Sequence, residues 1–140
     1  MTDDKIFYRS GYKYQLDRDY HIQTRIRPPK EIDTQFILLK SDGSLTVKDG
    51  YAWDGTSGLI IDTDENLRAS LVHDAFYQLM RKRKLKPRKK YKDEADKLFR
   101  TMCKDDSVFS PIAQIYYEVL KKFGSPSTEP KNAKKVRQAP

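Results

Sequence analysis

The stretch from Trp53 to Asp96 constrains this chain more than any other part of the sequence. It opens with a turn rich in small residues at 53–58, and it continues into an expected helix at 65–83 that carries the adjacent pair His73-Asp74. Asp96 follows in a second expected helix. A glycine-containing loop, a His-Asp pair and a later carboxylate are together the components of a calcium-assisted hydrolytic site.

Helical periodicity predicts which of these side chains can meet. In the first helix Val72, Ala75, Phe76 and Leu79 form an apolar stripe, and His73 lies at its edge. Adjacent residues on a helix point about 100° apart, so Asp74 is expected on a more polar side.

The second helix has an apolar stripe of its own, with Asp96 beside it. The stripe consists of Tyr91, Ala95, Leu98 and Met102. A carboxylate next to a buried face needs a specific partner, and His73 is the expected one.

The N-terminal part, residues 5–50, reads as β structure. Its segments alternate polar with aromatic or branched residues, and Ser41-Asp42-Gly43 is a strong signal for a tight hairpin turn. We therefore expect an α+β fold in which an antiparallel β-meander is followed by three helices.

The rest of the chain completes a single-domain organisation. We expect a domain at 1–124 that comprises the β-rich part 5–50, a glycine loop at 51–63 and helices at 64–124. A third helix is expected to have Ser110 as its N-cap and Pro111 at its first helical position, and to end at Gly124. Residues 125–140 hold three prolines and several lysines without periodicity, which predicts a polar basic tail.

Composition bears on location and partners. The single cysteine, Cys103, excludes an intrachain disulfide and suits a reducing compartment. No apolar run approaches the roughly 20 residues needed to span a bilayer, and no signal peptide opens the sequence. The formal charge of +8 is concentrated between residues 81 and 104, which hold twelve Lys or Arg against three Asp or Glu. Such a segment favours an anionic phospholipid surface, an acidic protein or nucleic acid as partner, or it is simply a solvated face.

The chemistry expected of the constellation is the activation of water. Asp96 would hold one ring nitrogen of His73 so that the other acts as general base, and Tyr77 is placed to hydrogen-bond Asp96. Loop carbonyls together with the Asp74 carboxylate would bind calcium, which stabilises an oxyanion.

These motifs resemble the secreted phospholipase A2 pattern. The sequence His73-Asp74-x-x-Tyr77 followed by Ala95-Asp96-x-x-Phe99 is closest to the disulfide-free phospholipase domains of small viral capsids. The resemblance covers residues 51–102. It implies that His73 is the base, that Asp96 orients it, and that Asp74 and Gly55 bind calcium together with the carbonyls of Trp53 and Ser57.

Nearly the whole chain also resembles an uncharacterised family of tailed bacteriophages. The shared features are Tyr-x-Trp-Asp-Gly-x-Ser-Gly at 51–58, Ser-Leu-Val-His-Asp-x-x-Tyr at 70–77, the later Ala-Asp, and a C-terminal helix that ends in Phe123-Gly124. This resemblance implies a phage protein, located in the host cytoplasm after synthesis or incorporated in the virion.

Other interpretations of the same residues stay open. His73 could be a histidine at the edge of the core that Asp96 satisfies without any reaction. Trp53 fits an anchor of the loop better than a substrate contact, and His21 in a strand pattern reads as structural. With only two histidines, a metal phosphohydrolase built on several His ligands is excluded. A non-enzymatic phage protein that serves in assembly, in the virion or as a host-interaction adaptor is the alternative to the hydrolase.

Overall fold

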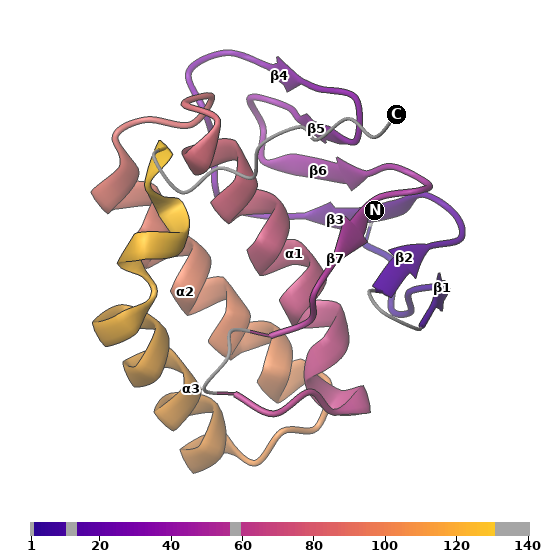
Figure 1. Ribbon diagram of the computed structural model, residues 1–140, viewed down its shortest axis with the longest axis vertical. Helices are drawn as coiled ribbons and strands as arrows, with labels where there is room; N and C mark the ends of the chain where they lie inside the picture. Colours follow the sequence, from indigo (N-terminus) through magenta and orange to yellow (C-terminus); the bar gives the residue numbers. More distant parts are fainter. Residues whose placement is uncertain (1, 11–13, 57–59, 131–140) are drawn as a thin grey trace, which may run out of the picture.

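The computed structural model describes residues 2–10, 14–56 and 60–130. It has antiparallel strands in the N-terminal half followed by three helices, so the expected α+β class is confirmed. The strands lie on one side of the first helix, and the two later helices lie on the other (Figure 1).

The strands divide between two sheets, whereas the sequence predicts one meander. Alternation predicts that a segment is a strand but not which neighbour it pairs with, and β3 here pairs with β6 across a long connection. All pairs are antiparallel. One sheet has the order β1-β2-β7, with bounds Tyr8–Arg9, Tyr14–Leu16 and Ala52–Trp53, and the other has the order β3-β6-β5-β4, with bounds Tyr20–Gln23, Ser44–Val47, Ile37–Leu39 and Ile32–Asp33.

The hairpin between β5 and β6 forms where Asp42-Gly43 predicts it. Gly43 has a φ of +90°, and the Asp42 carboxylate accepts a hydrogen bond from the Ser44 amide at 2.9 Å. A Cβ at Gly43 would lie 2.2 Å from the Thr24 carbonyl oxygen, so glycine is needed for space as well as for conformation.

Three helices follow the last strand. They are α1 (Asp64–Arg81), α2 (Arg88–Asp105) and α3 (Ser110–Phe123). At the start of α1 the side chains of Thr63 and Asn66 form a capping box. The helix ends at Arg81 rather than at the expected residue 83, and Arg83 adopts a left-handed φ of 59°. At α3 the cap position is Phe109, so Ser110 is the first helical residue and not the N-cap that the sequence suggests.

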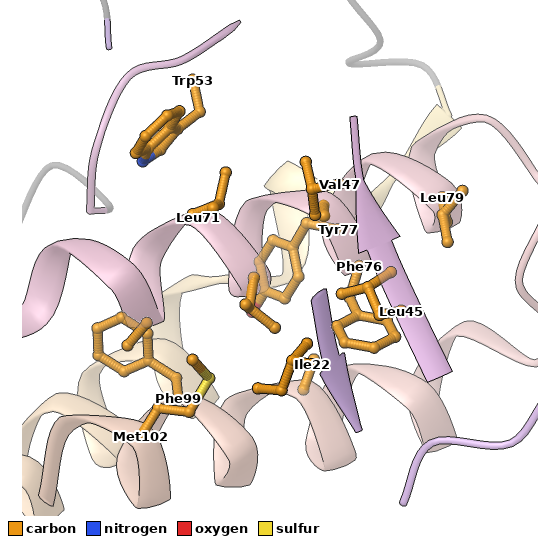
Figure 2. Packing of buried hydrophobic residues seen from close by; sticks show 14 of the residues in the cluster. Ile22, Leu45, Val47, Trp53, Leu71, Phe76, Tyr77, Leu79, Phe99 and Met102 are labelled. Atoms are coloured by element: carbon orange, nitrogen blue, oxygen red, sulfur yellow. The ribbon is translucent and has the colours of Figure 1, made fainter. Parts of the chain in front are cut away.

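The first helix is the centre of the fold. Of its 18 residues, 13 are buried, because strands cover one side and α2 covers another. In Figure 2, Phe76 of α1 lies beside Ile22 and Leu45 of the second sheet, while Phe99 and Met102 come from α2. A side chain at the boundary of α1 and α2 is therefore held by two packed surfaces.

The folded part extends beyond Gly124, where the sequence places the start of a tail. A short 3₁₀ helix, η1 (Ser125–Thr128), packs against all three helices, and Thr128 is fully buried. The prolines that suggest a tail are compatible with this turn, since Pro126 occupies its beginning. Residues 131–140 of the predicted tail lie outside the described residues.

None of the described helices combines the length and the apolar character that crossing a membrane requires.

Candidate functional site

His73 and Asp96 meet at the interface of α1 and α2. The Nε2 atom of His73 lies 2.8 Å from Oδ1 of Asp96, and the two side chains are 7% and 1% exposed. The interface brings them together because each flanks the apolar face by which its own helix packs on the other. The structure therefore has the contact between His73 and Asp96 that the sequence predicts.

Asp96 has two further partners. Tyr77, one turn after His73, donates from its hydroxyl to Oδ1 at 2.6 Å. Lys92, one turn before Asp96, donates from Nζ to Oδ2 at 2.7 Å. Burial acts to raise the pKa of Asp96, but the hydrogen bonds from His73, Lys92 and Tyr77 and the attraction of His73 hold it below its usual value.

The ionised carboxylate defines the protonation of the ring. An acceptor at Nε2 requires that this nitrogen carry the hydrogen, which leaves Nδ1 of neutral His73 as a lone-pair base. In the described part of the chain no buried side-chain nitrogen or oxygen lacks a hydrogen-bond partner, and His73 bonds through Nε2 alone. Nδ1 therefore keeps contact with solvent.

Aromatic rings line the histidine. The ring centroid of Tyr77 lies 3.9 Å from that of His73, and the Phe99 centroid lies 5.3 Å away in an edge contact. Tyr116 of α3 contacts Phe99 at 6.1 Å and is itself half-buried. These rings provide an apolar environment around the imidazole.

Asp74 points away from this cluster, as the helical phase predicts. The buried hydroxyl of Tyr51 donates a short hydrogen bond to its Oδ2, and a guanidinium nitrogen of Arg81 lies 4.0 Å from its Oδ1. Burial and the adjacent Asp74 charge raise the pKa of Tyr51 well above its usual value, so the phenol is a permanent donor. Base and neighbouring carboxylate thus have separate sets of partners.

Trp53 anchors the loop that follows it. Its side chain is 1% exposed, and Nε1 donates to the Ser70 hydroxyl at 2.9 Å, one helical turn before Asp74. Because Tyr51 contacts Asp74 and Trp53 contacts Ser70, the chain runs toward the N-terminal end of α1 as it enters the loop. The interpretation of Trp53 as an anchor agrees with this position.

The first residues of the glycine loop are held by Asp62, a carboxylate that the sequence does not single out. Asp62 accepts hydrogen bonds from the amide and the hydroxyl of Thr56, at 2.7 and 2.6 Å, and from the Tyr14 hydroxyl at 3.1 Å. Gly55 has a φ of +93°, and a Cβ there would lie 2.3 Å from Oδ2 of Asp62. Ser57, the third expected carbonyl ligand, lies outside the described residues.

The described oxygen atoms do not form a ready calcium site. Calcium takes six to eight oxygen ligands. Asp74 is engaged by Tyr51 and lies close to the cationic Arg81, while Asp62 fills the space beside Gly55. Among the described residues, moreover, no group of three or more His, Cys, Asp or Glu side chains is arranged to hold a metal ion. Calcium binding stays a prediction from the sequence, and it would require Asp74 to exchange partners.

The cations of the basic segment differ in exposure. The turn between α1 and α2, together with the first turn of α2, exposes seven cations. We call these residues the basic turn: Lys82, Arg83, Lys84, Lys86, Arg88, Lys89 and Lys90. Lys92, in contrast, is only 8% exposed.

Three residues of the site were not identified from the sequence, namely Lys92, Tyr51 and Asp62. Lys92 stands four residues before Asp96 on one helix, a spacing that indicates an ion pair, but the surrounding basic run makes it look like a surface residue. Tyr51 directly precedes β7 and is buried like Trp53, two residues away. No local pattern distinguishes Asp62 from an ordinary capping residue.

Comparison of the chain with protein-family models, with curated proteins and with solved structures gives no match.

Proposed function

We propose that this protein is a phage-encoded, phospholipase A2-like hydrolase that cleaves a lipid ester with the His73–Asp96 dyad. The observation that supports the proposal most is the buried pair itself, with Nε2 held 2.8 Å from an ionised carboxylate, which leaves Nδ1 as the free basic nitrogen of the neutral ring. Tyr77 bound to the same carboxylate adds the third member that the sequence resemblance implies.

The reaction uses His73 first as base and then as acid. Nδ1 takes a proton from water while the water oxygen forms a bond to the ester carbonyl carbon. The bond from that carbon to the alcohol oxygen then breaks, and the departing alcohol receives the proton from Nδ1. Asp96 stabilises the imidazolium that exists between these steps and keeps the ring in one orientation. The products are a fatty acid and an alcohol, which for a phospholipid substrate is a lysophospholipid.

The basic turn is the proposed contact with an anionic phospholipid surface. Its seven exposed cations lie in the connection between α1 and α2 and in the first turn of α2, so a bilayer bound there is next to the helix pair. Each cation near an anionic membrane contributes about 1 kcal/mol of attraction. Nucleic acid is the competing partner, and it would bind through phosphate contacts with a steep dependence on salt.

The test of the hydrolase is release of fatty acid from anionic phospholipid vesicles, with and without added calcium. We expect the wild type to release fatty acid and His73→Ala to lose at least about a hundredfold in rate, the usual contribution of a general base. His21→Ala is the matched control, because the other histidine is half-exposed on β3 and its ring bonds Asp3, away from the helix pair. Equal release by wild type and His73→Ala would remove the catalytic role.

A non-enzymatic accessory protein of the phage is the second candidate, and the partners of Asp74 and Asp62 favour it. Asp74 and Asp62 are satisfied by protein donors, as expected where a site has become a scaffold. On this alternative, vesicle lipids stay intact under all calcium concentrations, while the protein is recovered with virions from infected cells.

A further inference from the structure

The third helix has an apolar side that the fold leaves exposed. α3 packs against α2 and η1, and its buried residues are Ala113, Tyr117 and Leu120. A second row of apolar side chains runs along the same helix beside this packed face. We call this row the α3 stripe, and it consists of Phe109 at the N-cap followed by Ile112, Ile115, Tyr116, Val119 and Phe123.

Most of the α3 stripe is in contact with solvent. The exposed fractions are 72% for Phe109, 39% for Ile112, 55% for Ile115 and 56% for Phe123, while the other two members are half-buried. Elsewhere in the described part of the chain only Phe7, Tyr8 and Ile61 are large apolar residues with comparable exposure. α3 lies on the outer side of the helices, away from the strands (Figure 1). A row of exposed apolar side chains on one element indicates an interaction surface.

The spacing of the α3 stripe indicates that its partner is another helix. Apart from Ile115, its members follow one another at intervals of 3, 4, 3 and 4 residues. This is the pattern of a seven-residue repeat, by which one helix packs lengthwise along another. The buried residues Ala113, Tyr117 and Leu120 have the same kind of spacing, and they face α2. α3 therefore has two adjacent helix-packing faces, and α2 fills one of them.

The order of residues makes the α3 stripe complementary to itself. Tyr116 stands in the middle, and Phe109 and Phe123 are each seven residues away from it. An antiparallel copy of the helix thus brings apolar side chains opposite one another along the whole stripe, as a two-fold interface requires. Antiparallel packing also keeps Lys121 and Lys122 of the two copies roughly 15 Å apart, beyond the screening length in physiological salt. A parallel pair would bring these four ammonium groups together.

We infer that the α3 stripe is the interface of a homodimer, in which α3 packs antiparallel to α3 of a second copy with the two-fold axis near Tyr116. The ring of Tyr116 contacts Phe99, which contacts His73, so the interface borders the candidate site. The inference does not depend on the proposed hydrolysis, because it rests on the exposure and spacing of α3 alone.

A bilayer fits the α3 stripe less well than a second copy does. Helices that lie in the membrane interface carry lysine and arginine along their polar side. On α3 the exposed polar side holds Gln114 and Glu118, which are hydrogen-bonded to each other at 2.9 Å, and cations occur only in the last turn.

The exposed area suits reversible association. With about 200 Å² for a large apolar side chain, the four exposed fractions correspond to on the order of 400 Å² per copy. Together with the half-buried members and the polar rim, this approaches the total of about 1,000 Å² that specific interfaces need. We therefore expect monomer and dimer to exchange, with a dissociation constant in the micromolar range.

The test is sedimentation velocity of the full chain at concentrations from about 1 µM to about 1 mM. Wild type should pass from monomer to dimer as the concentration rises. Ile115→Lys and Ile115→Glu each place like charges near the two-fold axis, so each should raise the dissociation constant at least about tenfold. An equal mixture of the two variants brings opposite charges together across the axis and should recover the dimer.

Ile61→Lys is the matched control, because Ile61 is an isoleucine outside α3 that is 83% exposed. It should dimerise like wild type. Circular dichroism checks that each variant is folded, and Phe109→Ser, at the 72% exposed end of the stripe, covers the case in which the Ile115 variants do not fold. It should also weaken the dimer.

Three results would overturn the homodimer: a wild type that stays monomeric throughout, a dimer that persists in the folded stripe variants, or a mixture of the Ile115 variants that stays monomeric. Cosedimentation with vesicles of phosphatidylcholine and phosphatidylglycerol identifies the competing occupant. A monomeric wild type that binds these vesicles, with binding lost in Ile115→Glu and kept in Ile61→Lys, would assign the α3 stripe to a bilayer instead.

Discussion

The two carboxylates near His73, Asp96 and Asp74, differ in their burial and in their hydrogen-bond partners. Asp96 is buried at the α1–α2 interface and takes three donors, including an ammonium. Asp74, the residue that follows His73, is half-buried and accepts a hydrogen bond from the Tyr51 hydroxyl. The first arrangement is rigid and ready to orient a base, and the second must rearrange before it can hold a cation. The sequence motif therefore predicts both carboxylates, but only Asp96 is already arranged for its expected role.

The largest difference between these regions should appear in stability. Asp96→Ala leaves the Lys92 ammonium buried beside no carboxylate, which we expect to lower the free energy of unfolding by about 3 kcal/mol. Asp74→Ala removes a half-exposed partner of Tyr51 and should cost about 1 kcal/mol. Urea denaturation of both variants gives the comparison, and equal losses would show that the Asp96 cluster is not the more tightly organised region.

The pH dependence of stability should also follow the Asp96 cluster. The folded-state pKa of Asp96 is lowered, so the stability it contributes is present above the unfolded value of about 3.9 and is lost as pH falls through the folded value. The difference in unfolding free energy between wild type and Asp96→Asn should therefore shrink as the pH falls below about 4. Other lowered carboxylates, Asp42 and Asp93, occur in both proteins and cancel. A difference that does not shrink between about pH 4 and about pH 2 would contradict the charge assignment.

On the loop side, Gly55→Ala probes the contact with Asp62. A left-handed φ costs a non-glycine residue about 1 to 3 kcal/mol, and the added Cβ also meets the carboxylate at 2.3 Å. Gly50→Ala is the matched control, because Gly50 has a φ of +90° but its nearest contact would be an ordinary 3.4 Å from Phe36. We expect Gly55→Ala to destabilise more than Gly50→Ala, and Asp62→Ala to remove that excess. Equal destabilisation by Gly55→Ala and Gly50→Ala would contradict the close approach of Asp62 to Gly55.

The smallest expected effect concerns calcium. If calcium binds as the sequence resemblance implies, it competes with the Tyr51 hydroxyl for Asp74. Tyr51→Phe should then lower the calcium concentration for half-maximal thermal stabilisation about fivefold, the equivalent of one hydrogen bond. Differential scanning fluorimetry across calcium concentrations measures this shift, with magnesium as the control ion. If calcium stabilises neither wild type nor Tyr51→Phe, the expected calcium site is wrong.

The sequence predicts the parts of the molecule that depend on local periodicity. The three helices, the Asp42-Gly43 hairpin and the meeting of His73 with Asp96 all follow from which side chains share a face. The division of the strands into two sheets does not, because pairing between β3 and β6 joins segments far apart in the chain. The roles of Lys92 and Asp62 were missed for a related reason, since each depends on a partner that only the tertiary structure brings close.

The central claim is that Asp96 holds His73 with Nε2 protonated and Nδ1 available as the base. Nitrogen-15 chemical shifts of the imidazole ring at about pH 8, assigned with His21→Gln, report directly which nitrogen carries the hydrogen. We predict the Nε2–H tautomer for His73 in wild type, with the preference weakened in Asp96→Asn. A ring with its hydrogen on Nδ1 in wild type would contradict the orientation of the dyad and, with it, the proposed chemistry.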